Sequence, residues 1–133
     1  MESETGNLSK FELEVMDVLW KLGRASVREI HEQLPAREQA AYTTVQTIVT
    51  RLLGKGAVRQ VRKIGNAHIY EPAVARESAH RRLINDLIER LGGSVRPLMA
   101  HLVESKQISL EDVKELERAV REMPSGRKPK KER

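Results

Sequence analysis

After residue 56 the sequence pattern changes from that of helices to that of a β-hairpin, and this change constrains the fold most. In three successive stretches before residue 56, apolar side chains recur every three or four positions. From Ala57 we expect the two-residue period of a strand, in which Val58, Gln60 and Arg62 alternate with Arg59, Val61 and Lys63. A second strand-like stretch, Ile69 to Glu71, follows the turn pair Gly65-Asn66. The order of three helices and one β-hairpin is that of a winged helix-turn-helix domain.

Three helix starts are marked by capping sequences. In such a sequence a Ser hydroxyl and a carboxylate three residues later each satisfy a backbone N–H at the start of the helix. Ser9 with Glu12 predicts the start of the first helix, and Ser26 with Glu29 predicts the start of the second helix. Ser109 with Asp112 predicts the start of a helix near the C-terminus.

The third helix, predicted from Tyr42 to the break at Gly54 to Gly56, has one apolar and one polar face. Thr disfavours helices, so a helix that contains four Thr residues has accepted a cost in propensity. The apolar stripe comprises Val45, Ile48, Val49, Leu52 and Leu53, whereas Thr43, Gln46, Thr47 and Thr50 share the opposite side with Arg51 beside them.

Beyond Pro72 the pattern is helical again, and three short apolar stripes follow one another up to Met123. The last stripe has the spacing of a coiled-coil seam. These helices total roughly fifty residues, too few to bury a self-sufficient core, so we expect the stripes to pack against a second copy of the chain. The predicted dimer interface comprises Leu83, Leu87, Leu91, Leu98, Leu102, Val113, Leu116 and Val120.

We therefore predict a mainly α fold with two regions. An N-terminal winged helix-turn-helix occupies residues 8–73, and a C-terminal three-helix dimerisation region occupies residues 74–123. Residues 1–7 and the basic tail, residues 124–133, are predicted to be disordered because they lack an apolar pattern.

The composition excludes several classes of protein. Without cysteine the chain has no disulfide scaffold, no Cys-based metal site and no thiol nucleophile. The four His, at positions 31, 68, 80 and 101, are scattered, and no catalytic triad or phosphate-binding loop is present, so we predict no enzyme activity, metal or cofactor. An acidic N-terminus and the lack of a long apolar run predict no membrane insertion and a cytoplasmic location.

The excess positive charge lies in two segments. Residues 37–72 carry six basic and two acidic side chains, and residues 126–133 carry five basic and one acidic side chain. Either segment is a candidate site for a polyanion. Because the internal segment contains the polar-faced third helix and the hairpin, we expect it, rather than the tail, to bind double-stranded DNA.

A single helix fits the DNA major groove, where Gln can bond adenine through two hydrogen bonds and a Thr methyl can contact thymine. Phosphate contacts from cations on either side would set register and affinity. Thr43 and Thr44 have the alternative role of capping the helix, and His68 that of an exposed turn residue. The predicted base-reading residues are Thr43, Thr44, Gln46, Thr47 and Thr50, and the predicted phosphate contacts are Arg51, Lys55, Arg59, Arg62, Lys63 and His68.

Four sequence blocks in order, Leu13 to Trp20, Thr43 to Gly56, Tyr70 to Pro72 and Leu91 to Ser94, resemble the BlaI/MecI family of penicillinase repressors. The resemblance covers roughly residues 8 to 120. It implies a homodimer that binds a two-fold symmetric operator through its winged helices and uses its C-terminal helices as the dimer interface. It also implies control of resistance or stress genes.

The resemblance further implies that a membrane sensor protease triggers cleavage in the C-terminal region. The corresponding bond here joins His101 to Leu102, where cleaved family members resemble Asn-Phe. The copper-sensing branch of the family uses a C-terminal cysteine cluster, which this chain lacks.

The alternative function is a winged helix that serves only as a protein-interaction module. That function predicts an apolar or acidic exposed face on the third helix, whereas the sequence has Thr, Gln and Arg there.

Overall fold

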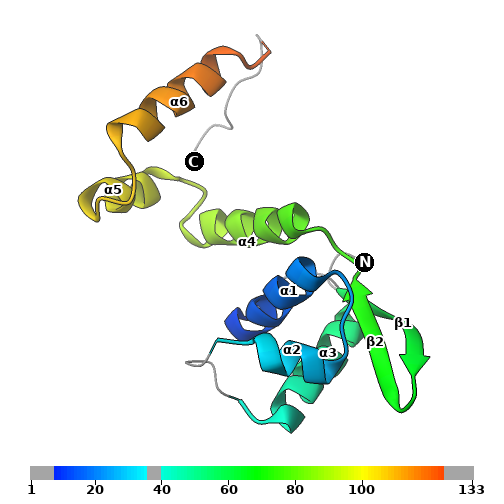
Figure 1. Ribbon diagram of the computed structural model, residues 1–133. Helices are drawn as coiled ribbons and strands as arrows, with labels where there is room; N and C mark the ends of the chain where they lie inside the picture. Colours follow the sequence, from blue (N-terminus) through cyan, green and yellow to red (C-terminus); the bar gives the residue numbers. More distant parts are fainter. Residues whose placement is uncertain (1–7, 36–39, 125–133) are drawn as a thin grey trace. The chain divides into compact units, whose positions relative to one another are not determined.

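The structure, a computed structural model, describes residues 8–35 and 40–124. Three helices are followed by an antiparallel hairpin and three further helices, so the predicted mainly α fold with a winged helix-turn-helix is confirmed (Figure 1). Residues 1–7 and 125–133, predicted to be disordered, lie outside the described residues. The elements are α1 (Lys10–Leu22), α2 (Val27–Gln33), α3 (Tyr42–Lys55), β1 (Val58–Ile64), β2 (Ala67–Pro72), α4 (Arg76–Arg90), α5 (Arg96–Glu104) and α6 (Leu110–Arg121).

The helix starts follow local sequence signals closely. Ser9 N–H donates to Glu12 Oε1 at 2.8 Å while Glu12 N–H donates to Ser9 Oγ at 3.1 Å, and the same reciprocal pairs form at α2 and α6. Gly23 ends α1 with a φ of +87°, a conformation that L side chains rarely adopt. All three predicted capping boxes are therefore confirmed.

One apolar core holds the first three helices and the hairpin together. Met16 and Leu19 of α1, Ile30 of α2 and Leu52 of α3 are fully buried in it. The hairpin contributes Val58 and Tyr70 from the ends of its strands nearest the helices. Because α3 buries Val45, Ile48, Val49 and Leu52, most of its predicted apolar stripe is confirmed.

Leu53 is the exception in that stripe, since 39% of its surface is exposed. The stripe on α3 is one residue narrower than predicted because the core beneath the last turn is already filled by Leu52 and Ala57, both fully buried. Leu22, at the end of α1, is likewise exposed at 40%.

The hairpin contains an irregularity that the alternating pattern does not predict. The register shifts between Gln60 and Arg62, so Val61 is an extra residue that has no partner on β2. The prediction of strict alternation along β1 is therefore wrong: Arg62 pairs with Ile69 and Lys63 pairs with His68. Side chains of paired residues share a face, so the bulge exchanges the faces on which Arg62 and Lys63 lie.

The hairpin is also joined to the helical part through its backbone. Ala25, between α1 and α2, forms an isolated antiparallel bridge with Tyr70. Ala25 N–H donates to Tyr70 O at 3.0 Å and Tyr70 N–H donates to Ala25 O at 2.9 Å. This short bridge, which sequence patterns missed, fixes the base of the hairpin against the start of α2.

The chain divides into two compact units, residues 1–85 and 86–133, so the division falls inside α4. Arg76 and His80 in the first turns of α4, and Val74 in the segment before α4, contact Trp20 of α1. Trp20 Nε1 donates to Val74 O at 2.9 Å, and the Arg76 guanidinium lies 5.5 Å from the centre of the indole ring. Because of these contacts the first compact unit extends to residue 85, whereas the sequence pattern predicts a winged-helix domain that ends at residue 73.

A partly buried ion pair connects α1 to the end of α3. Lys55 Nζ lies 2.8 Å from Glu12 Oε1, and the Glu12 side chain is only 1% exposed. Burial acts to raise the pKa of Glu12, but the hydrogen bonds from Lys55 and from Ser9 N–H, with the charges of Lys55 and Arg51, outweigh it and hold the pKa below 4.5. The carboxylate thus caps one helix and pairs with another.

We expect Glu12→Gln to lower the free energy of unfolding at neutral pH by about 2 kcal/mol, because a charged hydrogen bond is weakened in a buried site. A folded-state pKa below the unfolded value means that the contribution of Glu12 is complete above about pH 4.5 and is lost as the pH falls through the folded pKa. The stability gap between the two proteins should therefore shrink in acid, as measured by urea unfolding from pH 7 to pH 3. Asp17→Asn, at an exposed position of α1, is the control. A gap that does not change with pH would contradict this role of the ion pair.

Candidate nucleic-acid interface

The five predicted base-reading residues lie on the exposed side of α3. Thr43, Thr44, Gln46, Thr47 and Thr50 are all exposed, while the opposite side of the helix is buried in the core. The N-cap of α3 is Ala41, which has no side-chain cap, so neither Thr43 nor Thr44 serves as the capping residue. Burial on one side therefore presents a polar surface of Thr and Gln on the other.

One of these Thr residues has a hydroxyl engaged within the helix. Thr47 Oγ1 donates to Thr43 O at 3.0 Å, the back-bond that Thr often forms one turn earlier in a helix. The hydroxyl proton of Thr47 is thus used, which leaves its oxygen lone pair and its methyl group for an external contact. Gln46 keeps a side-chain amide with two donors and an acceptor on the exposed side.

The two predicted phosphate-contacting cations of α3, Lys55 and Arg51, differ in exposure and in their partners. Lys55 pairs with the buried Glu12, so its ammonium group has a structural partner. Arg51 is exposed on α3 one turn before it, and its charge helps to keep Glu12 ionised. Of the two basic residues predicted on α3, Arg51 is therefore the one with an exposed side chain.

Arg59 on the wing is likewise part of a salt-bridge cluster. Its Nε lies 2.7 Å from Glu71 Oε2, and Arg24 Nε lies 3.0 Å from Glu71 Oε1. Hydrogen bonds from Arg59 and then Arg24 lower the pKa of Glu71 below its usual 4.5. One carboxylate thus holds two guanidinium groups on the face of the hairpin that Arg59 and Glu71 share.

The bulge places the other wing cations on opposite faces. Lys63 pairs with His68, which shares a face of β2 with Tyr70, while Arg62 pairs with Ile69 and shares the face of Arg59 and Glu71. Both Arg62 and Lys63 are exposed, and among residues 8–35 and 40–124 neither has an ion-pair partner. The groove described next is lined by His68 and Tyr70 from the face of Lys63 and, near the turn, by Ile64 and Ala67 from the face of Arg62.

A groove of about 600 Å³ lies between α3, the start of α2 and the tip of the hairpin. Gln46 and Thr50 from the polar side of α3 form part of one wall, and His68 with the turn residue Asn66 forms part of another. The groove therefore connects the predicted base-reading surface with the wing. The full lining comprises Ser26, Val27, Arg28, Tyr42, Gln46, Thr50, Ile64, Asn66, Ala67, His68 and Tyr70.

Among the exposed residues that line this groove, sequence reasoning missed Arg28, Tyr42 and Asn66, which carry polar groups, and the apolar Ile64 and Ala67. Arg28 lies in the first turn of α2, inside the capping sequence from Ser26 to Glu29. The sequence signal for Arg28 is a basic residue at the start of the second helix of a helix-turn-helix. The sequence pattern predicts only a turn position for Asn66.

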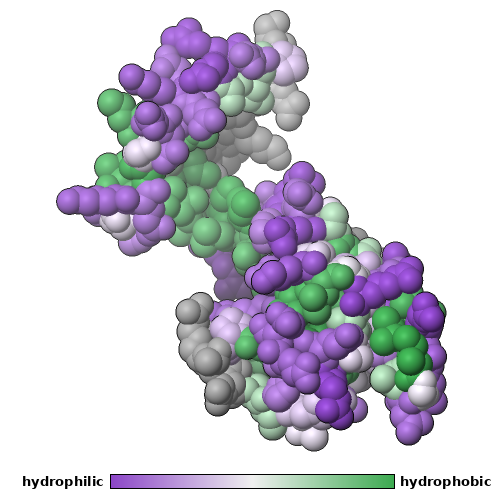
Figure 2. All heavy atoms as spheres, viewed as in Figure 1, coloured by the Kyte–Doolittle hydropathy of each residue, from purple (hydrophilic) through white to green (hydrophobic). Residues whose placement is uncertain are grey.

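The apolar stripes of the C-terminal half are largely uncovered in the single chain. None of α4, α5 and α6 contains a buried residue, and Leu116 and Val120 of α6 are 55% and 64% exposed. Of the predicted interface residues, Leu83, Leu87, Val113, Leu116 and Val120 are exposed, and Leu91, Leu98 and Leu102 are half-buried. Figure 2 shows the hydrophobic surface that gathers over α5 and the adjoining end of α4.

The predicted cleavage bond lies inside a helix. His101 and Leu102 belong to α5, which has nine residues, and His101 is exposed while Leu102 is half-buried.

In the described part of the chain, no group of three or more His, Asp or Glu residues is arranged to hold a metal ion. None of the described helices is long and apolar enough to cross a membrane.

Comparison with known proteins identifies the family. A family model described as "Penicillinase repressor" matches residues 8–122. The chain is 35% identical to the transcriptional regulator BlaI of Mycobacterium tuberculosis (90% of this chain, 86% of that protein) and 27% identical to the penicillinase repressor of Bacillus licheniformis (91% and 94%). It is 26% identical to the methicillin resistance regulatory protein MecI of Staphylococcus aureus (87% and 94%).

Among solved structures, the solution structure of the DNA-binding domain of the repressor BlaI is 33% identical and covers 52% of this chain and 83% of that chain, with a TM-score of 0.47. The members of the family named above are transcriptional regulators and not enzymes. The match over residues 8–122 and the identity to these relatives together show that this chain belongs to the penicillinase repressor family of BlaI and MecI.

Proposed function

We propose that this protein is a transcriptional repressor that binds double-stranded operator DNA as a homodimer, through α3 and the hairpin. The observation that carries the proposal is the exposed face of Thr and Gln on α3, held outward by the buried stripe of the same helix. The related proteins named as repressors or transcriptional regulators support it. The genes under control belong to resistance or stress responses, by analogy with those relatives.

In this proposal α3 enters the major groove with its polar face toward the bases. The Gln46 amide can bond adenine through two hydrogen bonds, and the methyl groups of Thr47 and Thr50 can contact thymine methyl groups. Thr47 suits a methyl contact because its hydroxyl proton is already donated to Thr43 O. Gln46 is therefore the residue that we expect to carry most of the hydrogen-bonded base discrimination.

The phosphate backbone would run along the groove between α3 and the wing. His68 and Arg28 line this groove and would meet phosphates there, and Lys63, which pairs with His68 in the hairpin, would reach a phosphate beside it. Arg51 would contact a phosphate from α3, and Arg62 would reach one from the other face of the wing. Lys55 and Arg59 contribute mainly to folding, because each is paired with a carboxylate.

The direct test is fluorescence anisotropy of the full chain with labelled DNA from its own upstream region, at several salt concentrations. A repressor should bind one sequence far more tightly than scrambled DNA of equal length, with an affinity that falls steeply as salt rises. Equal, weak binding to every DNA would sink the proposal and favour a protein-interaction module.

Gln46→Ala should cost about 1–3 kcal/mol of discrimination between the preferred operator and operators with one substituted base pair, because a bidentate contact to a base edge is lost. Binding to scrambled DNA should change little. Gln33→Ala, which removes an exposed Gln from α2, is the matched control. The measurement is the ratio of dissociation constants across a panel of operator variants, and an unchanged ratio would rule out base reading by Gln46.

Lys63→Ala should weaken binding to all DNA sequences alike and reduce the slope of log affinity against log salt by about one unit. Arg59→Ala should have a smaller effect, because the Arg59 guanidinium is held by Glu71 at 2.7 Å. Salt titrations of both variants against the same DNA provide the comparison. If Arg59→Ala proved the more damaging variant, the assignment of the wing faces would be wrong.

Dimerisation is proposed because the C-terminal helices leave their apolar stripes exposed. Hydrophobic side chains at helical spacing on α6, led by Val113, Leu116 and Val120, would bury that surface against a second copy. A dimer would present two α3 helices to two half-sites related by two-fold symmetry, separated by one or more turns of DNA.

Leu116→Asp should weaken dimerisation by at least about 100-fold, since both copies lose a buried Leu worth about 1.5–3 kcal/mol. Lys114→Asp introduces the same charge at another exposed position of α6 and should leave the dimer intact. Analytical ultracentrifugation measures the equilibrium, and operator binding should weaken in parallel. A Leu116→Asp protein that stays dimeric would place the interface elsewhere.

The proposal includes relief of repression by cleavage of the His101–Leu102 bond. The exposed position of His101 gives a protease access to one side of that bond. Proteases bind extended substrates, so α5 must first unwind, and a helix of nine residues is short enough to be marginal on its own. A membrane sensor protease is the partner that the family resemblance suggests.

A further inference from the structure

One carboxylate on the wing pairs with two guanidinium groups that come from different segments of the chain. Arg24 lies between α1 and α2, Arg59 lies on β1, and Glu71 lies opposite Arg59 on β2. Arg24 Nε is 3.0 Å from Glu71 Oε1, and Arg59 Nε is 2.7 Å from Glu71 Oε2. Each carboxylate oxygen therefore has its own guanidinium partner, and two positive charges share one negative charge.

The carboxylate is much less accessible than its two partners. The Glu71 side chain is 19% exposed, whereas the side chains of Arg24 and Arg59 are 58% and 59% exposed. Hydrogen bonds from Arg59 and then Arg24 hold the pKa of Glu71 below 4.5, so the carboxylate is ionised at neutral pH. Without Glu71, this part of the wing would carry two exposed cations and no anion beside them.

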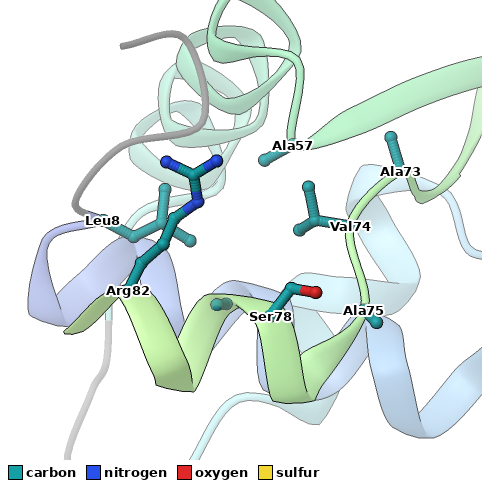
Figure 3. A pocket seen from close by; sticks show the side chains of 8 residues that line it. Leu8, Ala57, Ala73, Val74, Ala75, Ser78 and Arg82 are labelled. Carbon is teal, nitrogen blue, oxygen red and sulfur yellow. The ribbon is translucent and has the colours of Figure 1, made fainter. Parts of the chain in front are cut away.

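Other contacts hold the base of the hairpin. The backbone bridge joins Ala25 to Tyr70, the buried neighbour of Glu71, and Ala73 N–H donates to Ala57 O at 2.7 Å. Ala57 and Ala73, just before β1 and just after β2, line the pocket that Figure 3 shows. The hairpin thus keeps these contacts when the carboxylate is removed, and the effect of its charge can be measured separately.

The three charged residues lie apart from the groove beside α3. Of the residues that the structure describes, Gln46 and His68 line that groove, whereas Arg24, Arg59 and Glu71 do not. With α3 in the major groove of its operator, the protein would have one orientation on the DNA. On non-specific DNA it would bind through charge alone and in many orientations, so any exposed cation could contact a phosphate.

We propose that Glu71 increases sequence discrimination, because it pairs with two guanidinium groups that would otherwise bind phosphates of any DNA. This role rests on the proposed binding of operator DNA. Discrimination is the ratio of specific to non-specific affinity. Cations outside the groove would raise mainly the non-specific affinity, so neutralising them within the fold increases the ratio.

The test compares Glu71→Gln with the unchanged full chain, by fluorescence anisotropy with DNA from its own upstream region and with scrambled DNA of equal length. Affinity for scrambled DNA should rise at least about fivefold at about 0.1 M salt, and its salt slope should steepen by about one to two units, because one or two further phosphates are neutralised. Affinity for the operator should rise less than about twofold, because the freed cations lie outside the groove. Loss of a purely structural contact would not raise affinity.

Control variants separate pairing from net charge. Glu77→Gln removes an exposed carboxylate from the first turn of α4 and raises the net charge equally, and it should change affinity for scrambled DNA less than about twofold. Adding Arg24→Gln and Arg59→Gln to Glu71→Gln should abolish the gain. Thermal melts identify any variant that fails to fold, and Glu71→Ala provides a second measurement without the carboxylate.

Three results would overturn the role of Glu71: no gain on scrambled DNA, an equal gain from Glu77→Gln, or an equal gain on the operator. The unchanged protein tests the proposed function by itself, because equal binding to operator and scrambled DNA would refute the repressor. If the unchanged protein discriminates and Glu71→Gln discriminates equally well, the repressor proposal stands and only the role of Glu71 is refuted.

Discussion

Burial of one side of α3 is the constraint on which the rest of the N-terminal unit depends. Val45, Ile48, Val49 and Leu52 are removed from water by α1, α2 and the start of β1, so the helix has one stable rotation about its axis. Any other rotation would expose these side chains and bury hydroxyl and amide groups without partners. The core therefore also determines which chemistry the opposite face of the helix offers to a ligand.

Ion pairs over long sequence distances refine this arrangement. The Glu12 carboxylate joins the first turn of α1 to the last turn of α3, and the Glu71 carboxylate joins β2 to β1 and to the segment after α1. Both use basic side chains that a count of charges would assign to DNA. Net charge over residues 37–72 thus overstates the cationic surface that is available to a polyanion, because part of it is neutralised within the fold.

The features that could be predicted from the sequence are those with local causes. Reciprocal Ser and carboxylate hydrogen bonds act over three residues, apolar periodicity marks one face of a helix, and Gly65-Asn66 specifies a tight turn, so helix starts, the buried side of α3 and the hairpin were all predictable. The bulge at Val61, the bridge from Ala25 to Tyr70 and the partners of Lys55 and Arg59 depend on residues distant in sequence. The groove beside α3, with Arg28 in its lining, likewise exists only once the elements are assembled.

Because of the bulge in β1, the number of residues in that strand determines which face of the hairpin each later side chain occupies. Every residue beyond Val61 lies on the face opposite to the one that a regular strand would give it. Removing or adding one residue at this point would exchange the surroundings of Arg62 and Lys63 without altering the amino-acid composition of the wing. If two family members differ by one residue in the length of β1, a sequence alignment would match side chains that lie on opposite faces of the hairpin. Their wings should therefore be compared by strand register.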